Sequence, residues 1–270
     1  STFDELKQKV HARMDTFLRL GTTTIEAKSG YGLNLDGELK SLEVLDSTNS
    51  NHEIDIISTF MGAHAIPEEY ENNSDDYVDY LCNVMIPEVS KQGIAKYNDV
   101  FCEDGYFNLE QTKKILQKGL DHGLLPRIHA DEFQNLGGSS LAGKMKCISA
   151  DHLMNINDQD ISSMVKSNVP AVLLPGTTFF LGKSNYAPYL KIKNSGIDVA
   201  IATDYNPGSS NIQSMVFIIT LATIYMNMDI YEAIQASTYV PSKLLNIDNK
   251  VGSIEIGKNA DIILWNIKEP

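Results

Sequence analysis

The chain has 270 residues, of which 43% are hydrophobic and 21% are charged, and its net charge is −13. This length allows one large core or two modest ones, and a single barrel-type domain of this size is common. The acidic balance and the lack of any Lys/Arg cluster exclude a nucleic-acid partner, because phosphate backbones require a basic surface. The apolar runs are too short to span a bilayer, so we expect no membrane partner either.

Cysteine usage and the chain start bear on cellular location. The three cysteines, Cys82, Cys102 and Cys147, are far apart and form no C-x-x-C pair. Such an odd set indicates reduced thiols in a cytoplasmic protein. No signal peptide precedes the first predicted helix, and a first residue of Ser1 rather than Met leads us to expect a truncated N-terminus.

Amphipathic helices alternate with short apolar runs along the chain, which is typical of a parallel sheet with helical crossovers. The first helix begins with Thr2 and Glu5 spaced as a capping box, and Gly21 ends it. Another helix is predicted to begin at Asn108, with Gln111 three residues later. The predicted strands are 22–27, 54–60, 99–102, 125–129, 147–152, 171–174 and 198–202; the other predicted helices are 36–48, 75–92, 139–144 and 158–166, with more up to 245.

These elements make seven strand–helix units, preceded by a helix that has no strand before it. We therefore predict an α/β fold over residues 1–245, a (β/α)8 TIM-type barrel that lacks its first strand. An open doubly wound sheet is the alternative, but no glycine-rich phosphate loop follows the first strand.

The pattern changes over residues 246–270. Segments 251–257 and 261–267 resemble two strands joined by a Gly/Asn turn. Two strands have too little core to stand alone. We therefore predict that this segment is the remnant of a small β-sandwich, which pairs with strands from elsewhere.

Polar side chains follow several strands at the end where a barrel carries its active site. They occur at 26–31, 62–64, 129–132, 151–152 and 203–208. Histidines and carboxylates converging there fit a metal-assisted hydrolase. The same residues could instead have purely structural roles. A lone histidine is more often structural than a metal ligand. Asp204 could cap a helix after Pro207, and Glu132 could cap a helix or form a salt bridge. Tyr31, on a mobile glycine loop, is either part of a turn or an aromatic lid. For the histidines at helices, His11, His52 and His122, we expect solvated surface roles.

Six of these motifs occur in order with family-like spacing, at 26–32, 60–65, 129–133, 149–153, 174–179 and 202–210. Together they resemble the imidazolonepropionases of the amidohydrolase superfamily, and the resemblance runs through nearly the whole chain. The stretch 252–262 is similar to the superfamily tail that returns to a β-sandwich. The resemblance implies hydrolysis of 4-imidazolone-5-propanoate to N-formimidoyl-L-glutamate in histidine degradation, with a small-molecule substrate and a homodimer as a compatible assembly.

The resemblance also implies roles for individual residues. His129 and Asp204 match ligands of one divalent metal, Zn or Fe. Glu132, His152 and Asp204 match catalytic residues. The residues that match substrate contacts are Tyr31, His64, Glu132, Asn206, Gly208 and Ser209.

One departure concerns the metal. The superfamily carries an H-x-H ligand pair on its first strand, and no H-x-H occurs in this sequence. Two ligands cannot reproduce a three- or four-ligand site. We therefore expect this chain alone to be inactive. The alternatives are another amidohydrolase, such as a nucleobase deaminase, or a non-catalytic domain.

Overall fold

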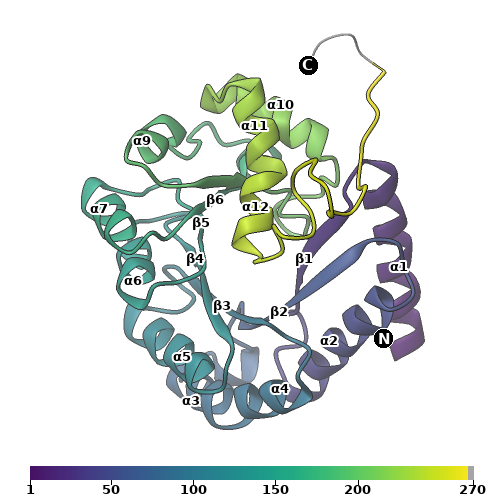
Figure 1. The fold of residues 1–270 in the computed structure, drawn as a ribbon. Coiled ribbons are helices and arrows are strands. Elements are labelled where there is room, and N and C mark those ends of the chain that lie inside the picture. The colour runs from purple at the N-terminus through teal and green to yellow at the C-terminus, as the bar shows by residue number, and fades with distance from the viewer. Residues whose placement is uncertain (267–270) are drawn as a thin grey trace.

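Seven parallel strands form one sheet, in chain order from β1 to β7, in the computed structural model, which describes residues 1–266. Figure 1 shows the strands curled around a centre, with most helices outside them. Within residues 1–266, β1 and β7 do not pair with each other, so the sheet is curled but open on one side. The strands are β1 (Thr24–Lys28), β2 (Asp55–Ala63), β3 (Tyr97–Cys102), β4 (Leu125–Ala130), β5 (Ala150–His152), β6 (Ala171–Leu173) and β7 (Val199–Ile201).

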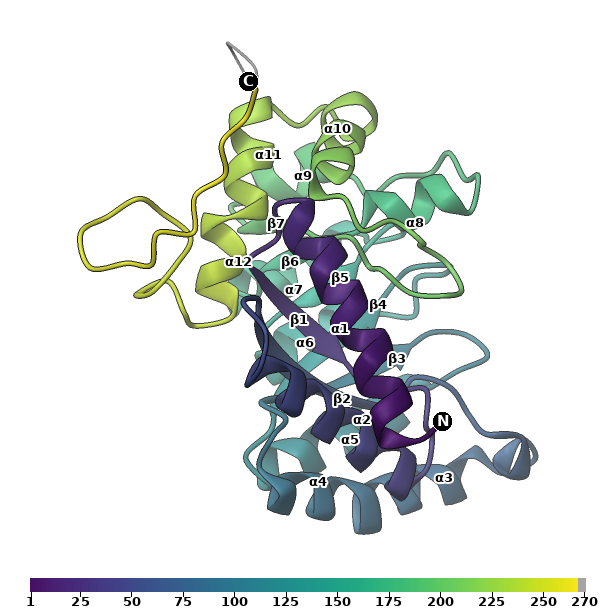
Figure 2. The same ribbon diagram turned by 90° about the vertical axis from the view of Figure 1, so that its right-hand side faces the viewer.

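The predicted α/β barrel class is thereby confirmed, and each of the seven predicted strands is present. A helix, α1, precedes β1 and lies along it in the side view of Figure 2. The helices are α1 (Phe3–Arg19), α2 (Leu35–Asn49), α3 (Ser74–Tyr80), α4 (Ile86–Gln92), α5 (Leu109–Asp121), α6 (Gly138–Met145), α7 (Asp158–Lys166), α8 (Pro175–Phe180), α9 (Tyr189–Asn194), α10 (Met215–Met226), α11 (Ile230–Ser237) and α12 (Tyr239–Leu244).

Local capping explains where several helices begin. Thr2 and Glu5 form the predicted capping box of α1, and Asn108 and Gln111 form that of α5. In each box the cap side chain accepts from a backbone N–H, and the later side chain accepts from the N–H of the cap. These hydrogen bonds satisfy orphan donors of the first helical turn.

The single helix predicted over 75–92 is wrong in one respect. The segment is helical but divides into α3, a π-helical turn (Leu81–Met85) and α4. Pro87 lies in the first turn of α4 and has no N–H to donate to a carbonyl four residues earlier. A π turn directly before the proline changes the register of the hydrogen bonds at that point.

The two strands predicted near the C-terminus do not form within the described chain, and their pairing with strands from elsewhere stays a prediction. Neither 251–257 nor 261–266 is a strand, and Ile267 lies outside the described residues. A strand needs a neighbour for its backbone groups, and nothing within residues 1–266 pairs with this segment. Its apolar side chains are exposed as a result: Ile254 is 89% and Leu264 is 94% accessible.

Two further observations bear on the sequence predictions. All three cysteines are free and buried, as expected. No helix in the described part of the chain is long and apolar enough to cross a membrane.

Candidate active site

A cavity of about 1770 Å³ opens at the C-terminal ends of the strands and continues into the barrel interior. All the predicted site residues line it, although they come from strand ends and loops far apart in the chain: Tyr31, His64, His129, Glu132, His152, Asp204, Asn206, Gly208 and Ser209. The parallel topology brings these loops to one end of the sheet, as in other barrels.

His129 lies on the inner face of β4 and is oriented by Asp99 on the neighbouring strand β3. Its Nδ1 is 3.1 Å from Asp99 Oδ1, and both side chains are buried. Because a carboxylate only accepts, Nδ1–H donates this bond. Burial opposes the charged form of His129, but Asp99 outweighs it and raises the pKa of His129 to about 9.

His152 and Glu132 form a second buried pair beside His129. His152 Nε2 lies 3.5 Å from Glu132 Oε2, and the His129 and His152 ring centroids are 5.1 Å apart. Burial lowers the pKa of His152 against the pull of Glu132, and burial raises the pKa of Glu132 against the pull of His152. Both shifts favour the uncharged forms of the two side chains.

Asp204 reaches the same place from the loop after β7. Its Oδ2 accepts a hydrogen bond of 2.6 Å from Thr177 Oγ1, on the short helix α8. The alternative reading of Asp204 as a helix cap is wrong, because Ser214 caps the next helix, α10. Thr177 lies in the motif 174–179 but was given no role from the sequence, and its helix is too short for hydrophobic periodicity to reveal.

His129, His152 and Asp204 can together offer ligands to a metal ion. One ligand atom from each lies within 4.8 Å of the others. Nδ1 of His152 is buried without a hydrogen-bond partner among the described residues. Nδ1 of His129 is hydrogen-bonded to the Asp99 carboxylate, which is an arrangement typical of metal-binding histidines. Imidazole nitrogens and a carboxylate oxygen are ligands suited to Zn or Fe.

Tyr31 and His64 form one wall of the cavity. Their rings meet edge to face with centroids 5.0 Å apart, and His64 Nδ1 donates to Gly30 O at 2.9 Å. Burial lowers the pKa of His64, so the ring is held neutral with its proton on Nδ1. Its Nε2 therefore carries a lone pair that can accept a hydrogen bond.

The loop after Asp204 is held by its own side chains. Asn206 Oδ1 accepts from the N–H groups of Gly208 (2.8 Å) and Ser209 (2.7 Å), and its Nδ2 donates to Asp204 O (2.7 Å). Asn206 therefore builds this loop with both ends of its amide. Direct substrate contact by Asn206, Gly208 or Ser209 remains a prediction.

Charged residues fill the barrel interior beneath His129. Lys28 Nζ lies 2.7 Å from Glu26 Oε1, 2.8 Å from Asp99 Oδ2 and 3.8 Å from Asp151 Oδ2. Asp99, His129 and Asp151 also approach one another closely enough to share an ion. The Lys28 ammonium already supplies a cation beside both carboxylates. Asp99 was missed from the sequence, although a charge within an otherwise apolar strand calls for a buried partner.

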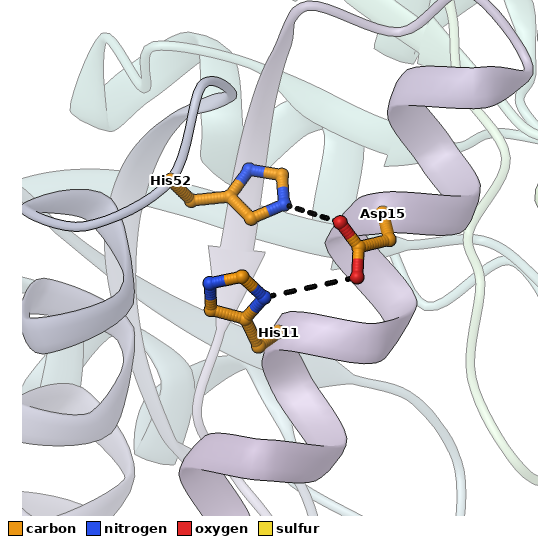
Figure 3. Close-up of side chains that lie close together, drawn as sticks. All are labelled: His11, Asp15 and His52. Carbon is orange, nitrogen blue, oxygen red and sulfur yellow. Dashed lines mark hydrogen bonds and ion pairs between the residues drawn. The ribbon is translucent and has the colours of Figure 1, made fainter.

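A further histidine cluster lies outside the cavity, between α1 and the turn before β2 (Figure 3). His52 Nε2 lies 3.3 Å from Asp15 Oδ1, and His11 Nδ1 lies 3.8 Å from Asp15 Oδ2. Ile54 N–H donates to His52 Nδ1 at 3.0 Å, which places the neutral ring's proton on Nε2. That nitrogen therefore donates to Asp15 and has no lone pair for a metal. The side chain of His52 is only 3% exposed, so its predicted solvated role is wrong.

Comparison with known proteins finds relatives over almost the whole chain. A model described as the amidohydrolase family matches residues 127–270. An imidazolonepropionase of Brevibacillus brevis is 46% identical over 269 residues, covering 100% of this chain and 63% of that protein. One from Geobacillus thermodenitrificans is 44% identical, covering 97% of this chain and 61% of that protein. The chain spans less than two thirds of the length of these relatives.

Solved structures share the fold at much lower identity. An atrazine chlorohydrolase from Arthrobacter aurescens, crystallised with zinc and atraton, matches with a TM-score of 0.74 at 14% identity, over 96% of this chain and 63% of that one. A guanine deaminase from C. acetobutylicum matches with a TM-score of 0.68 at 17% identity, over 95% of this chain and 65% of that one. At such identities the likeness concerns the fold alone.

Proposed function

Since the chain belongs to the amidohydrolase family, we propose that it serves the hydrolysis of 4-imidazolone-5-propanoate to N-formimidoyl-L-glutamate. The observation that carries the chemistry is the convergence of His129, His152 and Asp204 within 4.8 Å, beside Glu132. The substrate is inferred from the imidazolonepropionases that match the chain over almost its whole length.

One divalent metal ion, Zn or Fe, is part of this proposal. His129 and Asp204 would hold it, and His152 also lies within ligand reach of both. When bound, such an ion supplies Lewis-acid chemistry, since it makes water more acidic and polarises a carbonyl. The unpartnered nitrogen of His152 and the Asp99-oriented ring of His129 support this assignment.

The protein's own groups would move the protons. Water adds its oxygen to the ring carbonyl carbon, and Asp204 orients that water and accepts its proton. His152 hydrogen-bonds the carbonyl oxygen. As the C–N bond breaks, Glu132 delivers a proton to the leaving ring nitrogen, so that the water is divided between the new carboxyl and N–H groups. General acid–base help of this kind accelerates reactions by roughly 10²–10⁴-fold.

The electrostatics of Glu132 and His152 support these roles. Burial raises the pKa of Glu132, which brings the carboxyl closer to the pH at which it can both take and give a proton. Burial lowers the pKa of His152, which keeps its ring neutral. Two neighbouring groups with opposite shifts are typical of acid–base sites.

Substrate recognition would use the rest of the cavity. Tyr31 and His64 would contact the substrate from one wall, and the loop of Asn206, Gly208 and Ser209 would close the other side. Glu132 would contact the ring as well as protonate it. The neutral His64 ring, with a lone pair on Nε2, supports a hydrogen bond from a ring N–H.

Glu132→Gln tests the mechanism. Because this chain alone is expected to be inactive, the assay follows loss of imidazolone absorbance in a form extended to the relatives' length, with metal content measured in parallel. We expect a 10²–10⁴-fold loss of turnover at unchanged metal content. Glu110→Gln, which changes an exposed carboxylate in the first turn of α5, is the matched control. Normal turnover by the Glu132 variant would remove this residue from the mechanism.

Nucleobase deamination, the alternative left open by the sequence, is the activity to exclude. An ammonia-release assay with guanine, cytosine and adenine separates the two. Ammonia release without imidazolone consumption would favour a deaminase. If the extended form binds no metal and consumes none of these substrates, a non-catalytic role takes the place of both.

A further inference from the structure

The loop that carries Tyr31 wraps around a buried carboxylate. Glu38, in the first turn of α2, is 0% exposed. Its Oε2 accepts from Gly30 N–H at 2.9 Å, and its Oε1 accepts from the N–H groups of Gly32 at 2.8 Å and Leu33 at 3.0 Å. One side chain therefore binds the backbone on both sides of Tyr31.

Other contacts hold the same loop from outside. Tyr77 Oη lies 3.2 Å from Leu33 O and 2.8 Å from Gly62 O, where it can donate. His64 Nδ1 donates to Gly30 O at 2.9 Å. The loop thus has hydrogen bonds on its carbonyls as well as on its amides, and its backbone cannot shift without breaking several of them.

Close packing leaves no room for a side chain at either glycine of this loop. A Cβ on Gly30, whose φ is +110°, would lie 2.6 Å from Met61 O. A Cβ on Gly32 would lie 2.6 Å from the carbonyl carbon of Gly37. The two glycines are therefore required for close approach to β2 and α2, rather than for the mobility expected of them from the sequence.

We propose that Glu38 is a positioning residue, whose carboxylate fixes the Gly30–Leu33 backbone so that Tyr31 forms a preformed wall of the cavity instead of a moving lid. Tyr31 itself is 61% exposed and edge-to-face with His64, so its place depends on the backbone beneath it. A wall that is already in place adds no ordering cost when a ligand binds. Glu38 thereby acts on ligand binding without touching the ligand. This role rests on the proposed substrate contact of Tyr31.

The charge and shape of Glu38 both matter for this role. A carboxylate offers lone pairs on both oxygens to three N–H donors. In Glu38→Gln the amide NH2 turns a donor toward at least one of those N–H groups, at almost unchanged volume. Glu38→Asp keeps the carboxylate but shortens the side chain by one methylene, so it should retain part of the hydrogen bonding to the loop that Glu38→Gln loses. Asp36→Asn changes an exposed carboxylate of the same helical turn and is the control.

Amide hydrogen exchange tests the positioning without any substrate or metal. In the unchanged protein, Gly30, Gly32 and Leu33 should exchange at least tenfold more slowly than Tyr31, whose own N–H has no partner among the described residues. Glu38→Gln should remove this difference, Glu38→Asp should restore part of it, and Asp36→Asn should preserve it. Equal exchange at all four amides of the unchanged protein would overturn the proposal, even if the variant fails to fold.

The second measurement is the split between KM and kcat for imidazolone hydrolysis by the metal-loaded form of the relatives' length. Glu38→Gln should raise KM about tenfold, the effect of losing one charge-assisted hydrogen bond, and change kcat less than threefold. A variant with lost amide protection and unchanged KM would overturn the proposal. If no protein form consumes imidazolone, the proposed function fails, and the exchange data still decide whether Glu38 holds the loop.

Discussion

The inner face of the sheet differs between its two sides. On β1, β3, β4 and β5 it is lined by charge: Glu26, Lys28, Asp99, Arg127 and Asp151 contact one another in the barrel interior. Toward β6 and β7 it is apolar, with Val172, Leu174 and Ala200 forming a small cluster that continues to Val240 and Leu244. The candidate site straddles the two, since His129 stands on the charged side and Asp204 follows the last strand of the apolar side.

The two sides of the sheet can stabilise the site in different ways. Ion pairs and hydrogen bonds in a buried network have directions, so the charged side can fix the orientation of His129 through Asp99. Apolar contacts have no direction and contribute according to the area they bury. We therefore expect a substitution on the charged side to lower the unfolding free energy strongly, because it leaves a buried charge with fewer partners. On the apolar side, we expect the loss of unfolding free energy to follow the side-chain volume that is removed.

Lys28→Met should have the largest effect. It removes the ammonium that lies within 2.8 Å of both Glu26 and Asp99, so that Glu26 keeps only Arg127 and Asp99 keeps only His129 as a positive partner. Removing one partner of a buried ion pair costs about 3–5 kcal/mol, measurable as a loss of unfolding free energy in urea. Lys114→Met is the control, because Lys114 pairs with Asp79 at the surface and both side chains are more than half exposed. Similar losses in the two variants would show that the interior charges are as well solvated as surface ones.

Leu174→Ala should be the next largest change and tests the apolar side. Leu174 is buried, so the substitution removes apolar contacts and leaves a cavity, at a cost of about 2–3 kcal/mol. Leu190→Ala, at a half-exposed position, is the matched control and should cost well under 1 kcal/mol. A loss at Leu174 as small as that at Leu190 would mean that this side of the sheet is loosely packed.

The pH dependence of stability should show the smallest of the three effects. Asp99 raises the pKa of His129 to about 9 in the metal-free protein, above its ordinary value near 6.5. This contribution is fully present below pH 6.5 and is lost as the pH rises through about 9, so the unfolding free energy should fall by roughly 1–3 kcal/mol over that window. Chemical unfolding at successive pH values measures it. The decline should disappear in Asp99→Asn, and its persistence there would assign it to another group.

The alternating fold was predictable from the sequence because its signals are local. The capping pairs at Thr2 and Asn108 and the short β-branched strands depend on neighbouring residues, and the structure has them where they were expected. Other features depend on distant partners. Segments 251–257 and 261–266 have strand-like sequences but no neighbouring strand in the described chain. The π turn before Pro87 was not predicted, although the proline is a local signal for an interrupted helix.

The candidate site was predictable as a set of positions but not as a set of contacts. Polar residues after consecutive strands of a parallel sheet must meet at one end, which brought His129, His152 and Asp204 together. The residues that orient them were given no such role from the sequence. Thr177 and Asp99 each bond to a site residue on another element, 27 and 30 positions away in the chain. Spacing within one motif carries no information about such pairs.

The strand ends that present the site have an unusual backbone. Asp131, His152, Leu153 and Asp204 have φ values of 55°, 76°, 62° and 49°, in the left-handed region that non-glycine residues rarely adopt. Each such residue costs about 1–3 kcal/mol of stability. Glycine would relieve that strain at His152 or Asp204 but would delete a side chain of the site. Selection for heat resistance and selection for chemistry therefore oppose each other at these positions, and we expect heat-adapted variants to gain their stability in the outer helices instead.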